Sequence, residues 1–111
     1  MNKPWGTETL LTAPDSPYCM KVLEVRRGER LSLQSHTEKH ETLYLAKGEA
    51  LLTLDKDSRL MLEGETVVVP PMTPHRIAAL TRCVIYEAST PETGTTIRHE
   101  DDYGRGNASY D

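Results

Sequence analysis

The sequence predicts an all-β fold, a single domain built as a small barrel or sandwich. Seven glycines and seven prolines divide the 111 residues into short segments, and no amphipathic helical stripe longer than three turns fits between them. The segments alternate apolar and polar residues with the two-residue period of a strand. They recur at an even spacing with turn residues between them, which is the pattern of sandwiches and small barrels.

The first half of the barrel region contains four of about eight expected strands. Residues Cys19–Arg26 alternate apolar and polar side chains, and Arg30–His36 keeps the period of two throughout. Thr42–Lys47 is short and apolar, and Gly48 ends it. Ala50–Leu54 is expected to be the next strand.

Four further strands follow a polar turn at Asp55–Ser58. They are expected at Arg59–Leu62, Thr66–Pro70, His75–Leu80 and Cys83–Ala88. We therefore expect one domain over residues 1–111, with a barrel at about 18–90 and flanking arms at 1–17 and 91–111. The segment after Thr90 is polar and is expected to be an extended tail, with its last six residues, GNASYD, frayed.

Composition and charge exclude several classes of protein. The net charge is −4 and the pI about 5.5, so no basic surface is expected to bind nucleic acid. No apolar run approaches the ~20 residues needed to span a bilayer, and the start, MNKPWGTETLL, lacks the pattern of a signal peptide. Cys19 and Cys83 show no CxxC spacing and are expected to be reduced and buried, as in a cytoplasmic protein.

Four polar residues carry the chemistry of the chain. Gln34 and His36 are two apart on an expected strand, so both point to one face. Glu41 opens the next strand after a four-residue loop, and His75 follows a turn with three prolines, so both can reach that face. Two imidazoles, one carboxylate and one amide oxygen suit one divalent metal ion per chain: zinc first, with manganese, iron, cobalt or nickel as alternatives.

Two spaced motifs resemble those of the cupin superfamily. The first, G-x5-H-x-H-x4-E-x6-G, is matched by Gly28, Gln34, His36, Glu41 and Gly48, with glutamine at the first histidine position. The second, G-x5-P-x-G-x2-H-x3-N, is matched by Gly64, Pro70, Met72, His75 and Ala79, with Met72 and Ala79 as departures. The resemblance implies a cupin jelly-roll barrel, or double-stranded β-helix, whose metal ligands are Gln34, His36, Glu41 and His75.

The resemblance narrows further through KPWGTETLL, GERLSLQSH, the pair His75-Arg76, and EDDYGR. These segments are similar to the cupin domain of type II mannose-6-phosphate isomerases, and the similarity runs from Pro4 to Arg105. That domain usually forms the C-terminal half of a bifunctional enzyme with a guanylyltransferase. A glutamine at the first ligand position is itself a feature of phosphomannose isomerase cupins.

The resemblance implies a metal-dependent aldose–ketose isomerase that acts on a carbohydrate or sugar phosphate. A proton would move between C1 and C2 through a cis-enediol, with the enediolate charge stabilised at the metal. The expected catalytic residues are Glu41, Glu38, Lys39 and Arg105, with His40 as a further possible base. The cations expected to bind a substrate phosphate are Arg30, Lys39, Arg76 and Arg105.

A second function stays open: a small metallo-cupin of the binding, sensing or oxygen-using type with no isomerase activity. The cupin fold hosts all of these, so the fold does not decide between them. The family commonly has three consecutive histidines, but here Thr37 and Glu38 follow His36. A homodimer is expected by resemblance to other small cupins.

Packing expectations follow from side-chain parity and composition. Arg30 shares the parity of the ligand strand, so it should face inward, where it either pairs with Glu87 or meets a substrate anion, and the pair with Glu87 is favoured. Trp5 should pack against an edge of the barrel. The segment Asp101–Arg105 should dock near the open end of the barrel, bury Tyr103 and bring the Arg105 charge to the site.

Overall fold

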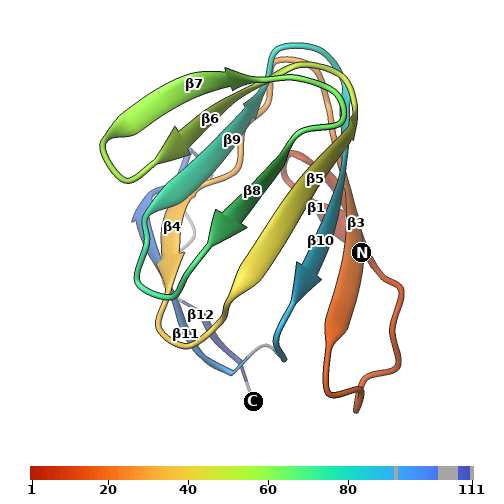
Figure 1. The fold of residues 1–111 in the computed structure, drawn as a ribbon, viewed down its shortest axis with the longest axis vertical. Helices are drawn as coiled ribbons and strands as arrows, with labels where there is room; N and C mark the ends of the chain where they lie inside the picture. Colours follow the sequence, from red (N-terminus) through yellow and green to blue (C-terminus); the bar gives the residue numbers. More distant parts are fainter. Residues whose placement is uncertain (92, 103–107, 111) are drawn as a thin grey trace.

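The computed structural model describes residues 1–91, 93–102 and 108–110, and it consists of two six-stranded antiparallel sheets that face each other (Figure 1). One sheet has the order β1-β2-β3-β10-β5-β8 and the other the order β12-β11-β4-β9-β6-β7. The strands are β1 (Asn2–Lys3), β2 (Gly6–Leu10), β3 (Cys19–Val25), β4 (Leu33–His36), β5 (Glu41–Lys47), β6 (Ala50–Leu54), β7 (Asp57–Met61), β8 (Thr66–Val69), β9 (His75–Ala79), β10 (Cys83–Ser89), β11 (Gly94–Glu100) and β12 (Ala108–Tyr110). Within these ranges no helix is long and apolar enough to cross a membrane.

The core lies between the two sheets, where alternate residues of each strand point inward. Leu45 and Ile85 come from one sheet and Leu52 and Ile77 from the other, and each of the four is at most 2% exposed. Burying a side chain of this size contributes roughly 1.5–3 kcal/mol to folding. Trp5 is buried in the same cluster, which confirms that it packs against the barrel.

All eight expected strands are present, and their ends differ from the expected ones by at most three residues. The largest shift is at the start of β4, where regular pairing begins at Leu33 and Arg30 forms only an isolated bridge with Ala78. The hairpin between β6 and β7 turns tightly at Asp55, which has a φ of 53°. Strand β7 therefore begins two residues before the expected Arg59.

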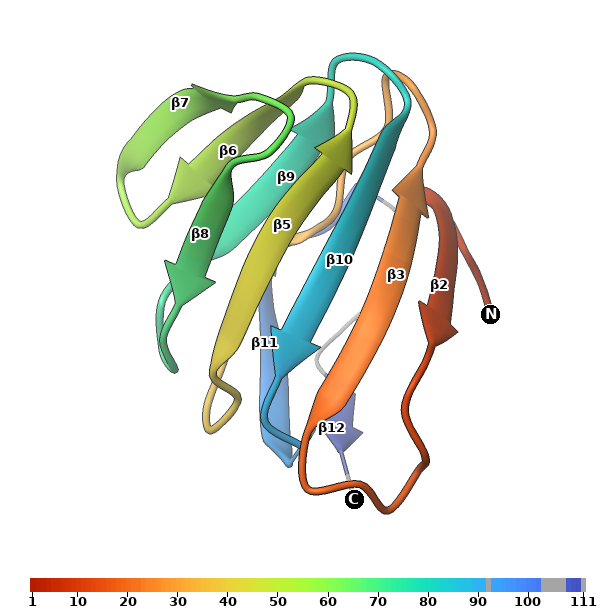
Figure 2. The same cartoon turned by 45° about the vertical axis from the view of Figure 1, so that its right-hand side comes forward.

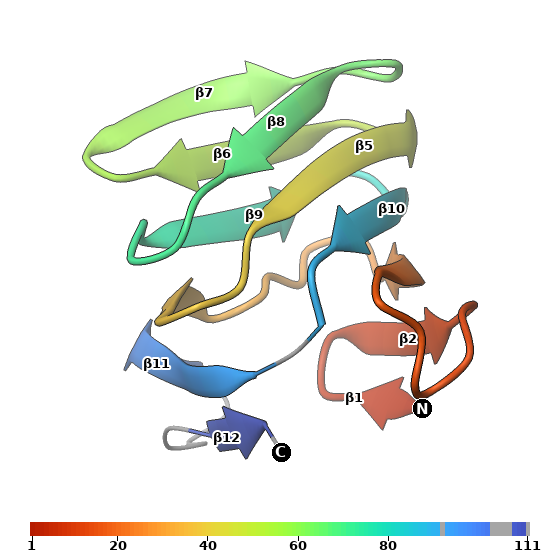
Figure 3. The same ribbon diagram turned by 60° about the horizontal axis from the view of Figure 1, so that its bottom comes forward.

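The two arms are parts of the sheets, which the sequence did not predict. Strand β2 pairs with β3 along five residues, and β11 pairs with the outer edge of β4. Figure 3 shows β11 and β12 extending the layer of β9 and β6, while β1 and β2 lie at the corresponding end of the other layer.

The expectation of a frayed end is wrong for Ala108–Tyr110, because these residues pair with β11. The β-branched residues Thr95–Ile97 favour a strand, but β11 lacks the alternation of apolar and polar residues that predicted the other strands.

Two glycine turns provide a matched test of backbone packing. Gly48 and Gly64 both have a positive φ, at 95° and 87°. A Cβ on Gly48 would lie 2.4 Å from the carbonyl oxygen of Arg82, whereas a Cβ on Gly64 would meet nothing within 4 Å. We expect Gly64→Ala to lower the free energy of unfolding by about 1–2 kcal/mol through backbone strain alone, and Gly48→Ala by about 1–3 kcal/mol more through the clash. Urea denaturation measures both, and equal losses would contradict the packing argument.

Candidate metal centre

Three strand ends bring the expected ligands together. His36 closes β4, Glu41 opens β5 and His75 opens β9. Gln34 lies directly opposite His75 in the pairing of β4 with β9, while Glu41 approaches from the facing sheet. The short loop between β4 and β5 crosses from one sheet to the other. The spacing of the first motif therefore places His36 on one sheet and Glu41 on the facing sheet, on two sides of the same site.

His36, Glu41 and His75 form a buried cluster that could hold a metal ion. Each side chain is at most 5% exposed, and one ligand atom from each lies within 4.8 Å of the others. Nε2 of His75 is 3.0 Å from Oε1 of Glu41, and Nε2 of His36 is 4.0 Å from Oε2. Both imidazoles therefore direct Nε2 toward the same carboxylate.

The other ring nitrogen of each histidine is held in place by a neighbour. Nδ1 of His75 is 2.9 Å from the backbone oxygen of Thr73, which only accepts, so Nδ1 carries the proton. A neutral His75 then points the lone pair of Nε2 at the Glu41 carboxylate. Two lone pairs at this distance repel unless a cation lies between them or Nε2 takes up a proton. Nδ1 of His36 is 3.0 Å from the Thr96 hydroxyl, and such partners orient metal-binding histidines.

The donor set fits a divalent transition-metal ion. Two neutral imidazoles and one carboxylate are ligands that zinc and its neighbours accept in proteins. Gln34 lines the same cavity as Glu41 and His75, and its amide oxygen lies 3.2 Å from the Ser32 hydroxyl. Its role as a fourth ligand stays a prediction.

A buried lysine lies between two carboxylates beside the cluster. Nζ of Lys39 is 3.1 Å from Glu41 and 2.9 Å from Glu87, and all three residues are buried. Burial raises the pKa of Glu41, but without a metal, when both imidazoles carry a proton on Nε2, the hydrogen bond from His75 and the nearby charges of Lys39, His75 and His36 outweigh it and lower the pKa from 4.5 to about 2. The contribution of Glu41 to stability is therefore complete above about pH 4.5 and is lost as the pH falls toward 2.

Glu87 has the opposite electrostatic balance. Burial raises the pKa of this carboxyl above its ordinary value, the charge of Lys39 offsets the shift only in part, and the charge of Glu41 raises the pKa further. Because this pKa is raised, the associated stability is complete at low pH and is lost as the pH rises through the folded-state pKa. Two neighbouring carboxylates thus have pKa values displaced in opposite directions, a pattern that often marks sites of proton transfer.

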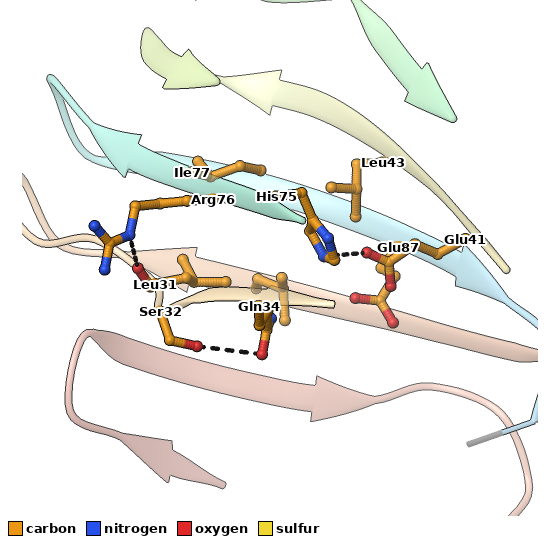
Figure 4. A pocket seen from close by; sticks show the side chains of 10 residues that line it. Leu31, Ser32, Gln34, Glu41, Leu43, His75, Arg76, Ile77 and Glu87 are labelled. Atoms are coloured by element: carbon orange, nitrogen blue, oxygen red, sulfur yellow. Dashed lines mark hydrogen bonds and ion pairs between the residues drawn. The ribbon is translucent and has the colours of Figure 1, made fainter. Parts of the chain in front are cut away.

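The cavity at this centre is small. Its volume is about 20 Å³, enough for a single water molecule or an ion. Figure 4 shows Gln34, His75, Glu41 and Glu87 around it, contributed by four different strands. Arg76 lines the cavity as well, and its Nε donates to the backbone oxygen of Leu31 at 2.8 Å.

The structure corrects the expectation for Arg30. Its side chain is 48% exposed and pairs with the Asp102 carboxylate at 2.5 Å, with a second hydrogen bond of 3.0 Å from Nη2. The partner of Glu87 is Lys39 instead. The parity of β4 does not extend back to Arg30, because regular pairing starts only at Leu33.

The remaining site predictions divide by exposure. Lys39, expected among the catalytic and phosphate-binding residues, is buried against Glu41, whereas Glu38 and His40 in the same loop are exposed. Asp102 contacts the barrel through Arg30, as the docking of the EDDYGR segment requires. Arg105 and Tyr103 lie outside the described residues.

Glu87 faces inward as expected, but the sequence predicted the wrong partner for it. It follows Cys83 and Ile85 on β10, which are both fully buried, so its inward parity could be read from the sequence. What could not be read was its partner, because Lys39 lies in an irregular loop with no periodicity.

Comparison with known proteins agrees with the geometry. A family model described as "Mannose-6-phosphate isomerase C-terminal" matches residues 1–104. Over 108 residues the chain is 31% identical to the mannose-1-phosphate guanylyltransferase of Escherichia coli, which covers 93% of this chain and 22% of that protein. The chain thus spans about one fifth of the length of this curated relative.

Two solved structures show the architecture. A cupin superfamily protein from Desulfitobacterium hafniense has a TM-score of 0.69 at 19% identity, and the match covers 76% of this chain and 75% of that one. Salicylate 1,2-dioxygenase from Pseudoaminobacter salicylatoxidans has a TM-score of 0.74 at 14% identity, with 81% of this chain and 26% of that one covered. At these identities the likeness concerns the fold alone, and it confirms the expected cupin barrel.

Proposed function

This chain belongs to the family of mannose-6-phosphate isomerase C-terminal domains, and from that membership we propose that it is a metal-dependent aldose–ketose isomerase of sugar phosphates. The observation that carries the proposal is the buried cluster of His36, Glu41 and His75, with Gln34 on the same cavity. Both described cysteines, Cys19 and Cys83, are free thiols, which supports a reducing compartment such as the cytoplasm.

We assign one divalent ion to Gln34, His36, Glu41 and His75, with zinc as the first candidate and manganese, iron, cobalt or nickel as alternatives. When bound, the ion would supply Lewis-acid stabilisation of negative charge on the sugar oxygens. Glu41, whose pKa is lowered to about 2, stays ionised as a ligand and is a weak base. This leaves the proton transfer to a neighbouring group.

Glu87 and Lys39 are the groups we assign to the proton transfer. Glu87 lines the cavity, and its raised pKa makes it a stronger base than an exposed carboxylate. Lys39 holds Glu87 next to the cavity through the 2.9 Å ion pair. Arg76 also lines the cavity, so it is the cation we assign to the phosphate, with Arg30 beside it through the shared partner Asp102.

The test follows the migrating proton directly. Protein reconstituted with metal and incubated with mannose 6-phosphate in D₂O should exchange the C2 proton for deuterium and form fructose 6-phosphate, which proton NMR detects. Glu87→Gln should slow exchange about 100-fold or more, the usual contribution of a general base. Glu49→Gln makes the same chemical change at an exposed glutamate and should leave the rate unchanged. Absence of exchange with all hexose and pentose phosphates, in protein that holds about one metal per chain, would contradict the proposal.

The size of the cavity favours one second candidate. A space of about 20 Å³ accommodates a diatomic or water-sized ligand without rearrangement, whereas a sugar phosphate requires the site to open. A ligand of that size is what a small metallo-cupin of the binding, sensing or oxygen-using type would take. Bound iron, with spectral bleaching and oxygen consumption in air, would favour this candidate; bound zinc would favour Lewis-acid chemistry.

A further inference from the structure

The end of β11 brings two carboxylates to two arginines of the barrel. Strand β11 belongs to the sheet that lies behind β5 and β10 in Figure 2, and it ends at Glu100. Asp102 follows two residues later. The Asp102 carboxylate lies against Arg30 and the Glu100 carboxylate against Arg76, so an acidic segment covers cations that face the candidate site.

The Asp102 carboxylate is bound by guanidinium groups in the way that a phosphate is. Oδ2 and Oδ1 accept hydrogen bonds of 2.5 and 3.0 Å from Nε and Nη2 of Arg30, and Oδ1 lies 3.9 Å from Nη2 of Arg76. Guanidinium groups bind carboxylates and phosphates through the same two-pronged geometry. The hydrogen bond from Arg30 lowers the pKa of Asp102 below its ordinary value, so an anion occupies this position at neutral pH.

Arg76 is fixed in place by backbone groups. Its Nε donates to the carbonyl oxygen of Leu31 at 2.8 Å, the bond drawn in Figure 4, and its Nη2 donates to the carbonyl oxygen of Glu100 at 3.1 Å. The side chain of Arg76 is 8% exposed and lines the cavity of the metal centre. An anion held between Arg30 and Arg76 is therefore adjacent to the wall of that cavity.

The charges of this contact cancel, and the contact is open to solvent. Nη1 of Arg76 is 3.5 Å from Oε2 of Glu100, so two carboxylates match the two arginines. Arg30 is 48% exposed, Asp102 39% and Glu100 67%. Exposed ion pairs of this kind are weak, so a dianion that meets both arginines can take the place of the Asp102 carboxylate.

We propose that Asp102 occupies the position of the substrate phosphate and that a phosphate monoester displaces it, which loosens the segment Glu100–Asp102. This inference rests on the assignment of Arg76 and Arg30 to that phosphate under the proposed function. Displacement provides part of the opening that a sugar phosphate requires at a cavity of about 20 Å³. The carboxylate is an internal competitor, so the apparent Kd for phosphate is the intrinsic Kd divided by the fraction of molecules in which the arginines are uncovered.

Calorimetric titration of the full, metal-free chain with inorganic phosphate measures this competition without a contribution from a metal ion. If Asp102 covers the arginines about 80% of the time, the upper end for an exposed ion pair, Asp102→Asn should bind phosphate about 5-fold more tightly than the wild type. Arg30→Gln should weaken binding about tenfold or more. Glu24→Gln is the matched control, because it removes the charge from another exposed pair, with Arg82 at 2.7 Å, and should leave the Kd unchanged.

Backbone NMR of the wild type shows whether the segment is displaced. Saturating inorganic phosphate or mannose 6-phosphate should move the amide signals of Glu100–Asp102 toward random-coil positions and leave those of β6 unchanged. Mannose, which has no phosphate, should move neither set. Thermal melts of each variant establish that a change in affinity is not a loss of fold.

Three results would overturn the proposal: phosphate that binds without moving the Glu100–Asp102 signals, an equal Kd in the wild type and in Asp102→Asn, or no binding to either protein at about 20 mM phosphate. The proposed isomerase activity fails separately. A chain that shows the displacement but does not exchange the C2 proton contradicts the activity and keeps this inference. An active enzyme whose KM for mannose 6-phosphate is the same in Asp102→Asn contradicts this inference alone.

Discussion

Replacing His36 and His75 together by alanine should reduce bound metal from roughly one ion per chain to almost none, because two imidazoles supply most of the affinity of a mixed nitrogen and oxygen site. Elemental analysis after dialysis against a trace metal mixture measures the change. The wild type should also melt higher with metal than after chelation, since an ion that binds only the folded state stabilises it. That difference should disappear in the double variant.

Two features sharpen this metal experiment. His40→Ala removes an exposed histidine four residues from His36 and should keep the full metal content. The variants remove imidazoles only, so Glu41 keeps its ion pair with Lys39 and the fold should persist. Equal metal content in the wild type and the double variant would exclude the site.

Lys39→Met should cost about 3–5 kcal/mol of unfolding free energy near neutral pH, since it leaves buried carboxylates without their cation. Glu41 and Glu87 both rely on the Lys39 ammonium. Denaturation of metal-free protein measures the loss, and Lys56→Met, at an exposed turn position, should change stability by less than about 0.5 kcal/mol. The double variant Lys39→Met with Glu87→Gln should recover part of the loss, because it removes one of the two uncompensated charges.

The pH dependence of the Lys39→Met loss has a definite sign. The lysine lowers the pKa values of both carboxyls, so removing it raises both. Carboxyls with raised pKa values destabilise the fold when ionised and not when protonated. The deficit should therefore shrink as the pH falls from 7 toward 4. A deficit that is constant across this range would show that lost packing, and not charge, is its cause.

The barrel strands were predictable because half-buried strands alternate apolar and polar residues with a period of two. β6 was placed to the residue, and β5 and β10 to within one, since apolar residues alternate between glycine and polar turns. The motif spacing also located the three cluster residues. The arms were missed because β11 contains threonine and arginine around a single isoleucine and so has no apolar stripe. It forms a strand because it pairs with the open edge of β4.

The partners of charged side chains were the least predictable part of the site. Lys39 lies in an irregular loop, where no periodicity tells an inward side chain from an outward one, and only the fold brings it between two carboxylates. Arg30 was assigned inward by extending a strand parity past the point where pairing begins. Long-range charge pairing depends on which loops meet, and that is a property of the assembled sheets.

The hydrogen bond between His36 and Thr96 has a consequence for the order in which the site is made. His36 leaves the ribosome sixty residues before Thr96, and the β-strands between them already include Glu41 and His75. A nascent chain that ends before β11 contains all three cluster residues but lacks the hydroxyl that orients one imidazole. Loading of metal during synthesis would thus meet an unfinished site, and full affinity would arise only when the late-emerging strand joins β4.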